Sequence, residues 1–162
     1  MINTEKAFHW VINLLEENHI PFRISGGFAA RIHGAKRELA DIDLDVRETD
    51  IDKIHPLIKD KLIFGPEQYK DESWDLYLAT LDFNGQLIDL SGATKAKIFD
   101  LNTNQWVPFR VDFNDIVAFD VFGKKVPVIK ANDLINYKNM LKREVDISDI
   151  NELKRLLNYP DE

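Results

Sequence analysis

Hydrophobic and polar positions recur along this chain with the periods of helices and strands. Residues 4–17 place apolar side chains three or four positions apart, which is typical of a helix with one buried face. Residues 22–25 predict a short buried strand, and residues 28–33 predict a helix that ends at Gly34. Residues 40–47 alternate apolar and acidic positions, which indicates a further strand.

The middle of the chain is predicted to contain a helix, a loop and a hairpin. The helix extends from about residue 49 to residue 62 and is interrupted or restarted at Pro56. We expect a loop over residues 64–73. The pair Asn84-Gly85 then predicts a tight turn between two strands, residues 74–83 and 86–92.

The last third of the chain predicts a second hairpin and two closing helices. A turn is expected at residues 101–104, and a hairpin of residues 116–121 and 125–129 follows it. One helix extends from residue 132 or 133 to about residue 143, and Ser148 caps another whose buried positions are Ile150, Leu153 and Leu157.

These elements predict an α/β (α+β) fold, in which a short mixed, mostly antiparallel sheet packs against helices. We expect a single domain over residues 1–162, with closing helices at about residues 130–158. The sequence has no cysteine, which excludes disulfides and thiolate metal sites and makes a cytoplasmic location the expectation. Its N-terminus is amphipathic and acidic, so we expect neither a signal peptide nor a membrane partner.

The charge distribution is uneven. The net charge of −7 argues against a dedicated nucleic-acid binder. Residues 124–155 nevertheless contain eight basic side chains against five acidic ones. A basic segment beside an acidic site would suit a bound triphosphate, although a solvated helix face has the same composition.

Three aspartates at alternate positions, Asp41, Asp43 and Asp45, are the strongest candidates for chemistry. Alternate side chains of a strand share one face, so the three carboxylates repel one another unless a cation compensates them. Mg²⁺ prefers one or two carboxylates together with phosphate oxygens. A calcium loop does not fit, because Val46 occupies the position that requires glycine. The other interpretation is the solvated face of an edge strand.

Two further features add to this candidate site. Gly26 and Gly27 precede a helix and would let a phosphate approach the backbone, although they also suit a plain tight turn. They form neither a Walker loop nor a Rossmann fingerprint. Asp89, on the second strand of the predicted hairpin, is either exposed, salt-bridged or the third member of the acidic cluster. In the last case it would suit a general base for an attacking hydroxyl.

The sequence resembles the nucleotidyltransferase fold of the polymerase-beta-like superfamily. The resemblance depends on Gly26-Gly27, the Asp41-Ile-Asp43 motif and the later strand aspartate Asp89. Residues 37–46 are similar to lincosamide nucleotidyltransferases and AbiEii-type toxin transferases, and residues 130–157 also look like the closing helices of that group. The resemblance implies transfer of a nucleoside monophosphate from a nucleoside triphosphate to a hydroxyl acceptor, with a toxin–antitoxin role as one expectation.

The resemblance also implies roles for individual residues. Two divalent ions, Mg²⁺ or Mn²⁺, would bind the catalytic carboxylates Asp41, Asp43 and Asp89. The implied nucleotide-binding residues are Gly26, Gly27, Arg37, Lys138 and Arg143. The acceptor would be a small molecule, an RNA end or a protein. Related enzymes with small acceptors usually carry a longer accessory domain or a partner subunit for substrate recognition, and we expect little beyond the closing helices here. The alternatives are an inactive nucleotide- or partner-binding module on the same fold, and a plain scaffold.

Overall fold

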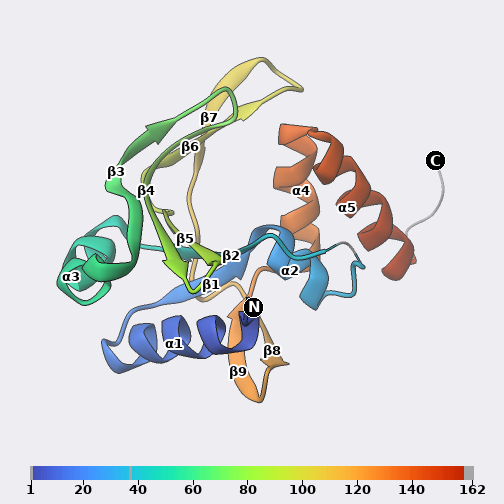
Figure 1. Ribbon diagram of the computed structural model, residues 1–162. Coiled ribbons are helices and arrows are strands. Elements are labelled where there is room, and N and C mark those ends of the chain that lie inside the picture. The colour runs from blue at the N-terminus through green and yellow to red at the C-terminus, as the bar shows by residue number, and fades with distance from the viewer. Residues whose placement is uncertain (1, 37, 159–162) are drawn as a thin grey trace.

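Helices begin and end this chain, and strands fill most of its middle (Figure 1). The helices are α1 (Thr4–Glu17), α2 (Gly26–Ile32), α3 (Glu48–Ile58), α4 (Ala131–Leu141) and α5 (Glu144–Leu156), and the 3₁₀ turn η1 (Lys59–Lys61) follows α3. The strands are β1 (Phe22–Ser25), β2 (Asp41–Val46), β3 (Leu62–Lys70), β4 (Trp74–Phe83), β5 (Gln86–Gly92), β6 (Ala96–Asp100), β7 (Gln105–Phe109), β8 (Val117–Val121) and β9 (Lys124–Val128).

The computed structural model describes residues 2–36 and 38–158, and within these ranges nine strands form one sheet. The strand order is β7-β6-β4-β5-β2-β1-β9-β8, and β3 pairs with β4 outside this path. β2 pairs with β5 and β1 with β9 in parallel, whereas the other described pairs are antiparallel. The predicted mixed, mostly antiparallel α/β class is confirmed, although the sheet is larger than the short one expected.

Several local predictions are correct because short-range sequence signals decide them. α1 occupies residues 4–17, and the Asn3 side chain accepts a hydrogen bond from the Lys6 N–H at its start. The turn between β4 and β5 lies at Asn84 and Gly85, whose φ angles of 48° and 93° suit the tight hairpin turn that this pair favours. The hairpin predicted near Phe122 forms as β8 and β9.

Other local predictions are wrong. Residues 62–70 form the edge strand β3 and not a loop, because the long strand β4 offers them a partner that the sequence pattern of β3 alone does not reveal. Pro56 lies inside α3 and does not interrupt it. α5 begins at Glu144, before Ser148, because the Asp146 side chain accepts the Arg143 N–H and caps the first turn.

Helices rise on one side of the central strands and the outer strands rise on the other side, with a space between them (Figure 1). α4 packs on α5 and contacts α2, and these helices lie together on one side (Figure 1). β3, β4, β6 and β7 curve up on the other side (Figure 1). The apolar face of α1 packs into the core through Phe8, Val11 and Leu15. Among the described residues, no helix is both long enough and apolar enough to cross a membrane. That residues 1–162 form a single domain stays a prediction.

Candidate active site

Neighbouring strands bring together the carboxylates of Asp41, Asp43 and Asp89. β2 and β5 are parallel and in register, so that Asp43 lies directly opposite Asp89. Each of the three residues offers one carboxylate oxygen, and these oxygens all lie within 4.8 Å of one another. All three residues are partly buried. The structure therefore unites the three predicted aspartates, while their role as metal ligands stays a prediction.

The cluster is electrostatically strained. Burial raises the pKa of Asp43 well above its usual value, and the charges of Asp89 and Asp41 raise it further. Burial also raises the pKa of Asp89, against the effect of a hydrogen bond of 2.7 Å that Thr80 donates to its Oδ1. Like charges this close require a proton or a cation between them.

A divalent ion fits the donor set of this cluster. Mg²⁺ holds oxygen ligands at about 2.1 Å, so two oxygens on one ion lie between about 3 and 4.2 Å apart. The carboxylate oxygens lie within 4.8 Å of one another, which small side-chain rotations bring into that range. Carboxylate oxygens are hard ligands and suit Mg²⁺ or Mn²⁺.

Asp45 belongs to a different network, although the sequence places it on the same face as Asp41 and Asp43. Its Oδ2 accepts a hydrogen bond of 3.0 Å from the Arg23 Nε, and its Oδ1 accepts one of 3.1 Å from the Ser25 hydroxyl. All three side chains are buried. Asp45 therefore ties β1 to β2 at the wall of the same pocket and does not join the cluster.

Gly26 is fixed by its backbone and by its closeness to the cluster. Its φ of +64° lies in the left-handed region, and a Cβ added to it would lie 2.2 Å from the Asp43 Oδ2. Its N–H donates a hydrogen bond of 2.9 Å to the Tyr137 hydroxyl. The glycine therefore makes room for a carboxylate, and Tyr137 of α4 already satisfies its amide.

The remaining predicted nucleotide-binding residues differ in their surroundings. Gly27 lines the same pocket as the aspartates. Arg37 lies outside the described residues. Lys138 has a side chain only 1% exposed, and its ammonium lies 3.0 Å from Asp146 and 3.1 Å from Asp149. These two carboxylates of α5 account for the buried charge of Lys138 without a nucleotide.

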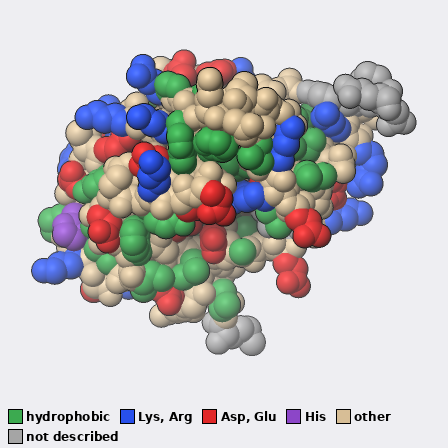
Figure 2. All heavy atoms as spheres, turned by 90° about the horizontal axis from the view of Figure 1, so that it is seen from above, with side chains coloured by type: hydrophobic (Ala, Val, Ile, Leu, Met, Phe, Trp, Pro, Cys, Tyr) green, Lys and Arg blue, Asp and Glu red, His purple; other side chains and the backbone are tan. Residues whose placement is uncertain are grey.

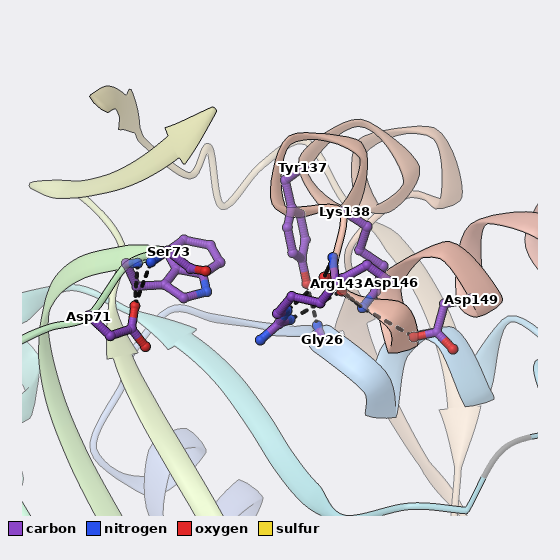
Figure 3. A network of polar contacts seen from close by, with 9 residues as sticks. Gly26, Asp71, Ser73, Tyr137, Lys138, Arg143, Asp146 and Asp149 are labelled. Atoms are coloured by element: carbon purple, nitrogen blue, oxygen red, sulfur yellow. Dashed lines mark hydrogen bonds and ion pairs between the residues drawn. The ribbon is translucent and has the colours of Figure 1, made fainter. Parts of the chain in front are cut away.

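Arg143 joins the same network from the exposed turn between α4 and α5 (Figure 3). Its Nε donates a hydrogen bond of 2.6 Å to the Asp146 Oδ2, and its Nη2 donates one of 3.1 Å to Oδ1. Although burial disfavours the ionised form, these hydrogen bonds and the charge of Lys138 lower the pKa of Asp146. The exposed part of Arg143 lines the pocket opposite Asp71, whose pKa its charge helps to lower.

The aspartate cluster opens into a pocket of about 570 Å³. Its other walls are largely apolar and include side chains from β3, β4, β7 and α4: Phe64, Tyr69, Trp74, Leu76, Leu78, Phe109 and Tyr137. In the view from above, hydrophobic, acidic and basic side chains meet near the middle of the face (Figure 2). The pocket has the volume of a small-ligand site and combines an acidic end with aromatic walls.

Thr80 and Tyr137 are site residues that the sequence analysis did not single out. The Asn84-Gly85 turn pairs Phe83 with Gln86, and counting back along the two strands places Thr80 opposite Asp89. The sequence therefore contained a signal for Thr80. The contact of Tyr137 with Gly26 joins residues 111 positions apart, and no local pattern could have indicated it.

Comparisons with known proteins place this architecture among nucleotidyltransferases. A candidate nucleotidyltransferase from Thermotoga maritima is similar to the chain with a TM-score of 0.72 and 18% identity, covering 99% of this chain and 97% of that one. A lincosamide antibiotic adenylyltransferase with lincomycin bound has a TM-score of 0.63 and 20% identity, covering 94% and 98%. The antibiotic-resistance factor ANT(2'')-Ia has a TM-score of 0.59 and 17% identity, covering 94% and 80%.

These likenesses show that the chain has the nucleotidyltransferase fold, as the sequence resemblance implied. No family model matches the sequence, and no curated protein matches it significantly. At identities of 20% or less the comparisons establish the architecture alone. The activity must therefore be argued from the site itself.

Proposed function

We propose that this protein is a metal-dependent nucleotidyltransferase that transfers a nucleoside monophosphate from a nucleoside triphosphate to a hydroxyl acceptor. One observation carries the proposal: β2 and β5 bring Asp41, Asp43 and Asp89 within 4.8 Å of one another at the end of a pocket. Burying three carboxylates together is costly unless a cation belongs there. The fold supports the same conclusion.

The proposed reaction is an in-line displacement at the α-phosphorus. The acceptor oxygen forms a bond to phosphorus, the bond to the bridging oxygen breaks, and pyrophosphate leaves with the electron pair. Two divalent ions on Asp41, Asp43 and Asp89, when bound, would stabilise the charge on the entering and leaving oxygens.

Each protein group has a proposed part in this reaction. Asp89, held by the hydrogen bond from Thr80, accepts the proton of the attacking hydroxyl. Gly26 leaves room for the Asp43 carboxylate, and Gly26 and Gly27 present backbone without side chains to the phosphates at this end of the pocket. The exposed guanidinium of Arg143 supplies a positive charge at the pocket. We assign Lys138 to positioning α5 and not to phosphate contact, because Asp146 and Asp149 already hold it.

Calorimetric titration with α,β-methylene-ATP tests the first step without turnover. We expect binding that needs Mg²⁺ or Mn²⁺ and that Asp41→Asn and Asp89→Asn each weaken at least tenfold. Asp120→Asn is the matched control, since Asp120 is an exposed strand aspartate on β8. Binding that is equally tight in EDTA would refute the metal dependence.

A labelling experiment tests the transfer itself. The protein is incubated with Mg²⁺, ATP labelled at the α-phosphate and pools of small molecules, RNA and protein. Covalent label in one pool, lost in Asp41→Asn, supports the proposal. Nucleotide binding with no label in any pool would favour a non-catalytic binding module on the same fold.

A further inference from the structure

The register of the sheet places five side chains in one line across the site. Ser25 lies opposite Asp43, Asp43 opposite Asp89, Asp89 opposite Thr80, and Thr80 opposite Phe64. Residues directly opposite in neighbouring strands point to the same face of a sheet. The line therefore begins beside the glycine turn, passes through the carboxylates and ends at the aromatic ring of Phe64 on β3.

This order assigns the two ends of the line to different ligands, provided that the proposed transferase function holds. An in-line displacement needs the entering oxygen, the phosphorus and the leaving oxygen in one line. We place the phosphates at the glycine end, because Gly26 and Gly27 line the pocket there with backbone and no side chain. The acceptor then enters from the opposite end, past Asp89 and Thr80.

The surface at that end consists of half-buried or buried apolar side chains from two paired strands. We define the β3–β4 wall as Phe64, Tyr69, Leu76 and Leu78, all of which line the pocket. Phe64 and Tyr69 pack edge to face with ring centroids 5.9 Å apart, and Tyr69 lies opposite Leu76 in the ladder. Such a surface binds the flat or apolar face of a ligand by contact and not by hydrogen bonding.

Hydrogen bonds hold the wall in place where it meets the turn between β3 and β4. The Tyr69 hydroxyl donates a hydrogen bond of 2.9 Å to Asp71. The Asp71 Oδ1 accepts the N–H groups of Ser73 and Trp74 at 2.7 Å each (Figure 3). These bonds fix the turn between β3 and β4. They also hold the Tyr69 hydroxyl, so that its ring remains the part available to a ligand.

The charge around the wall selects against anions. The carboxylates of the aspartate cluster line the pocket, together with two basic side chains, Lys138 and Arg143. Both of these cations are ion-paired with carboxylates of α5. An RNA end would bring several phosphates to this acidic surface, whereas a cation would gain from it and from the faces of the aromatic rings.

We propose that the β3–β4 wall binds the acceptor, and that the acceptor is a hydroxyl-bearing small molecule with an apolar ring face and no net negative charge. The proposal rests on the proposed transferase function and decides among the acceptor classes that the sequence left open. It assigns the nucleotide and the acceptor to opposite ends of one pocket, so both bind at the same time.

Two probes with the same ring and opposite charge test the wall directly. Tyramine carries an ammonium and 4-hydroxyphenylacetate a carboxylate. Trp74 lines the pocket above the wall, so its indole N–H signal in ¹H–¹⁵N spectra reports binding there, with the Trp10 and Trp106 signals as internal controls. We expect tyramine to shift the Trp74 signal and 4-hydroxyphenylacetate to bind at least tenfold more weakly.

Variants of Phe64 test whether tyramine binds at the β3–β4 wall. Phe64→Ala should weaken tyramine binding about tenfold. Phe64→Leu keeps an apolar side chain, so it should weaken tyramine binding less. Phe122→Ala is the control, because Phe122 is exposed in the turn between β8 and β9. Mg²⁺ with α,β-methylene-ATP should bind without displacing tyramine.

Different results overturn different claims. If the nucleotide displaces tyramine, the wall binds the nucleobase. That result would refute the acceptor site while leaving the transferase proposal intact. Equal binding of the anionic probe, tighter binding of a short RNA with a free 3'-hydroxyl, or no Trp74 shift would refute the acceptor class in the same way. Absence of metal-dependent nucleotide binding would overturn the proposed function and, with it, the acceptor assignment.

Discussion

Replacing Asp43 by asparagine should stabilise the metal-free protein, although it should damage the proposed activity. Asp43 is the carboxylate whose pKa burial and its neighbours raise most clearly. A raised folded-state pKa means that the ionised group opposes folding at neutral pH, and this penalty disappears as the pH falls below the unfolded value. Asparagine has nearly the same shape and carries no charge.

The size of the effect follows from Coulomb's law. Two carboxylates about 5 Å apart repel each other by about 3 kcal/mol at an effective dielectric constant of about 20. Asp43 has both Asp41 and Asp89 as neighbours, but it also loses the attraction of Lys138 when it becomes neutral. We therefore expect a net stabilisation of about 2 kcal/mol, which corresponds to a rise in Tm of about 4–8 °C for a chain of this size.

Thermal unfolding in EDTA and in Mg²⁺ provides the measurement. The wild-type protein should gain stability from Mg²⁺, since the ion relieves the same repulsion, and Asp43→Asn should gain much less. Asp120→Asn, on the exposed surface of β8, should change neither value. A Tm of Asp43→Asn in EDTA equal to or below the wild-type value would refute the claim that the cluster is strained.

Three further predictions concern the surroundings of the cluster. Gly26→Ala should lower stability and weaken metal-dependent nucleotide binding at least tenfold, because its Cβ would lie 2.2 Å from the Asp43 carboxylate. Gly123→Ala has a similar positive φ and no atom within 4 Å of its Cβ, so it should show only the backbone cost of about 1–2 kcal/mol, and equal binding defects in both variants would contradict the steric argument. Lys138→Met should cost about 3–5 kcal/mol in urea unfolding, because it removes the buried cation that Asp146 and Asp149 share, although Arg143 still holds Asp146. Asp146 has a lowered folded-state pKa, so its contribution to stability is complete above the unfolded carboxyl pKa of about 4 and is lost as the pH falls through the lower folded value. The acid limb of the stability curve should therefore be shallower in Asp146→Asn, and an unchanged slope would refute this assignment.

The sequence alone determined the elements whose signals are local. The apolar period of residues 4–17 and the Asn84-Gly85 turn each act within a few residues, and the structure agrees with both. The Asp41-Ile-Asp43 motif and its spacing from Gly26-Gly27 indicated the fold, which the structural comparisons confirm.

Only the tertiary structure decided the different roles of residues that have similar sequence patterns. Asp43 and Asp45 have the same surroundings in the sequence, yet β5 places Asp89 opposite Asp43 while β1 supplies Arg23 and Ser25 to Asp45. One aspartate therefore enters a site and the other a buried ion pair.

Two other features depended on partners distant in the chain. Residues 62–70 became a strand because β4 was available to pair with them, which their own sequence did not predict. Lys138 had the sequence properties of a phosphate ligand, but the packing of α4 on α5 surrounds it with two carboxylates. The sequence determines the charge of a side chain. The packing of elements far apart along the chain determines which partner compensates that charge.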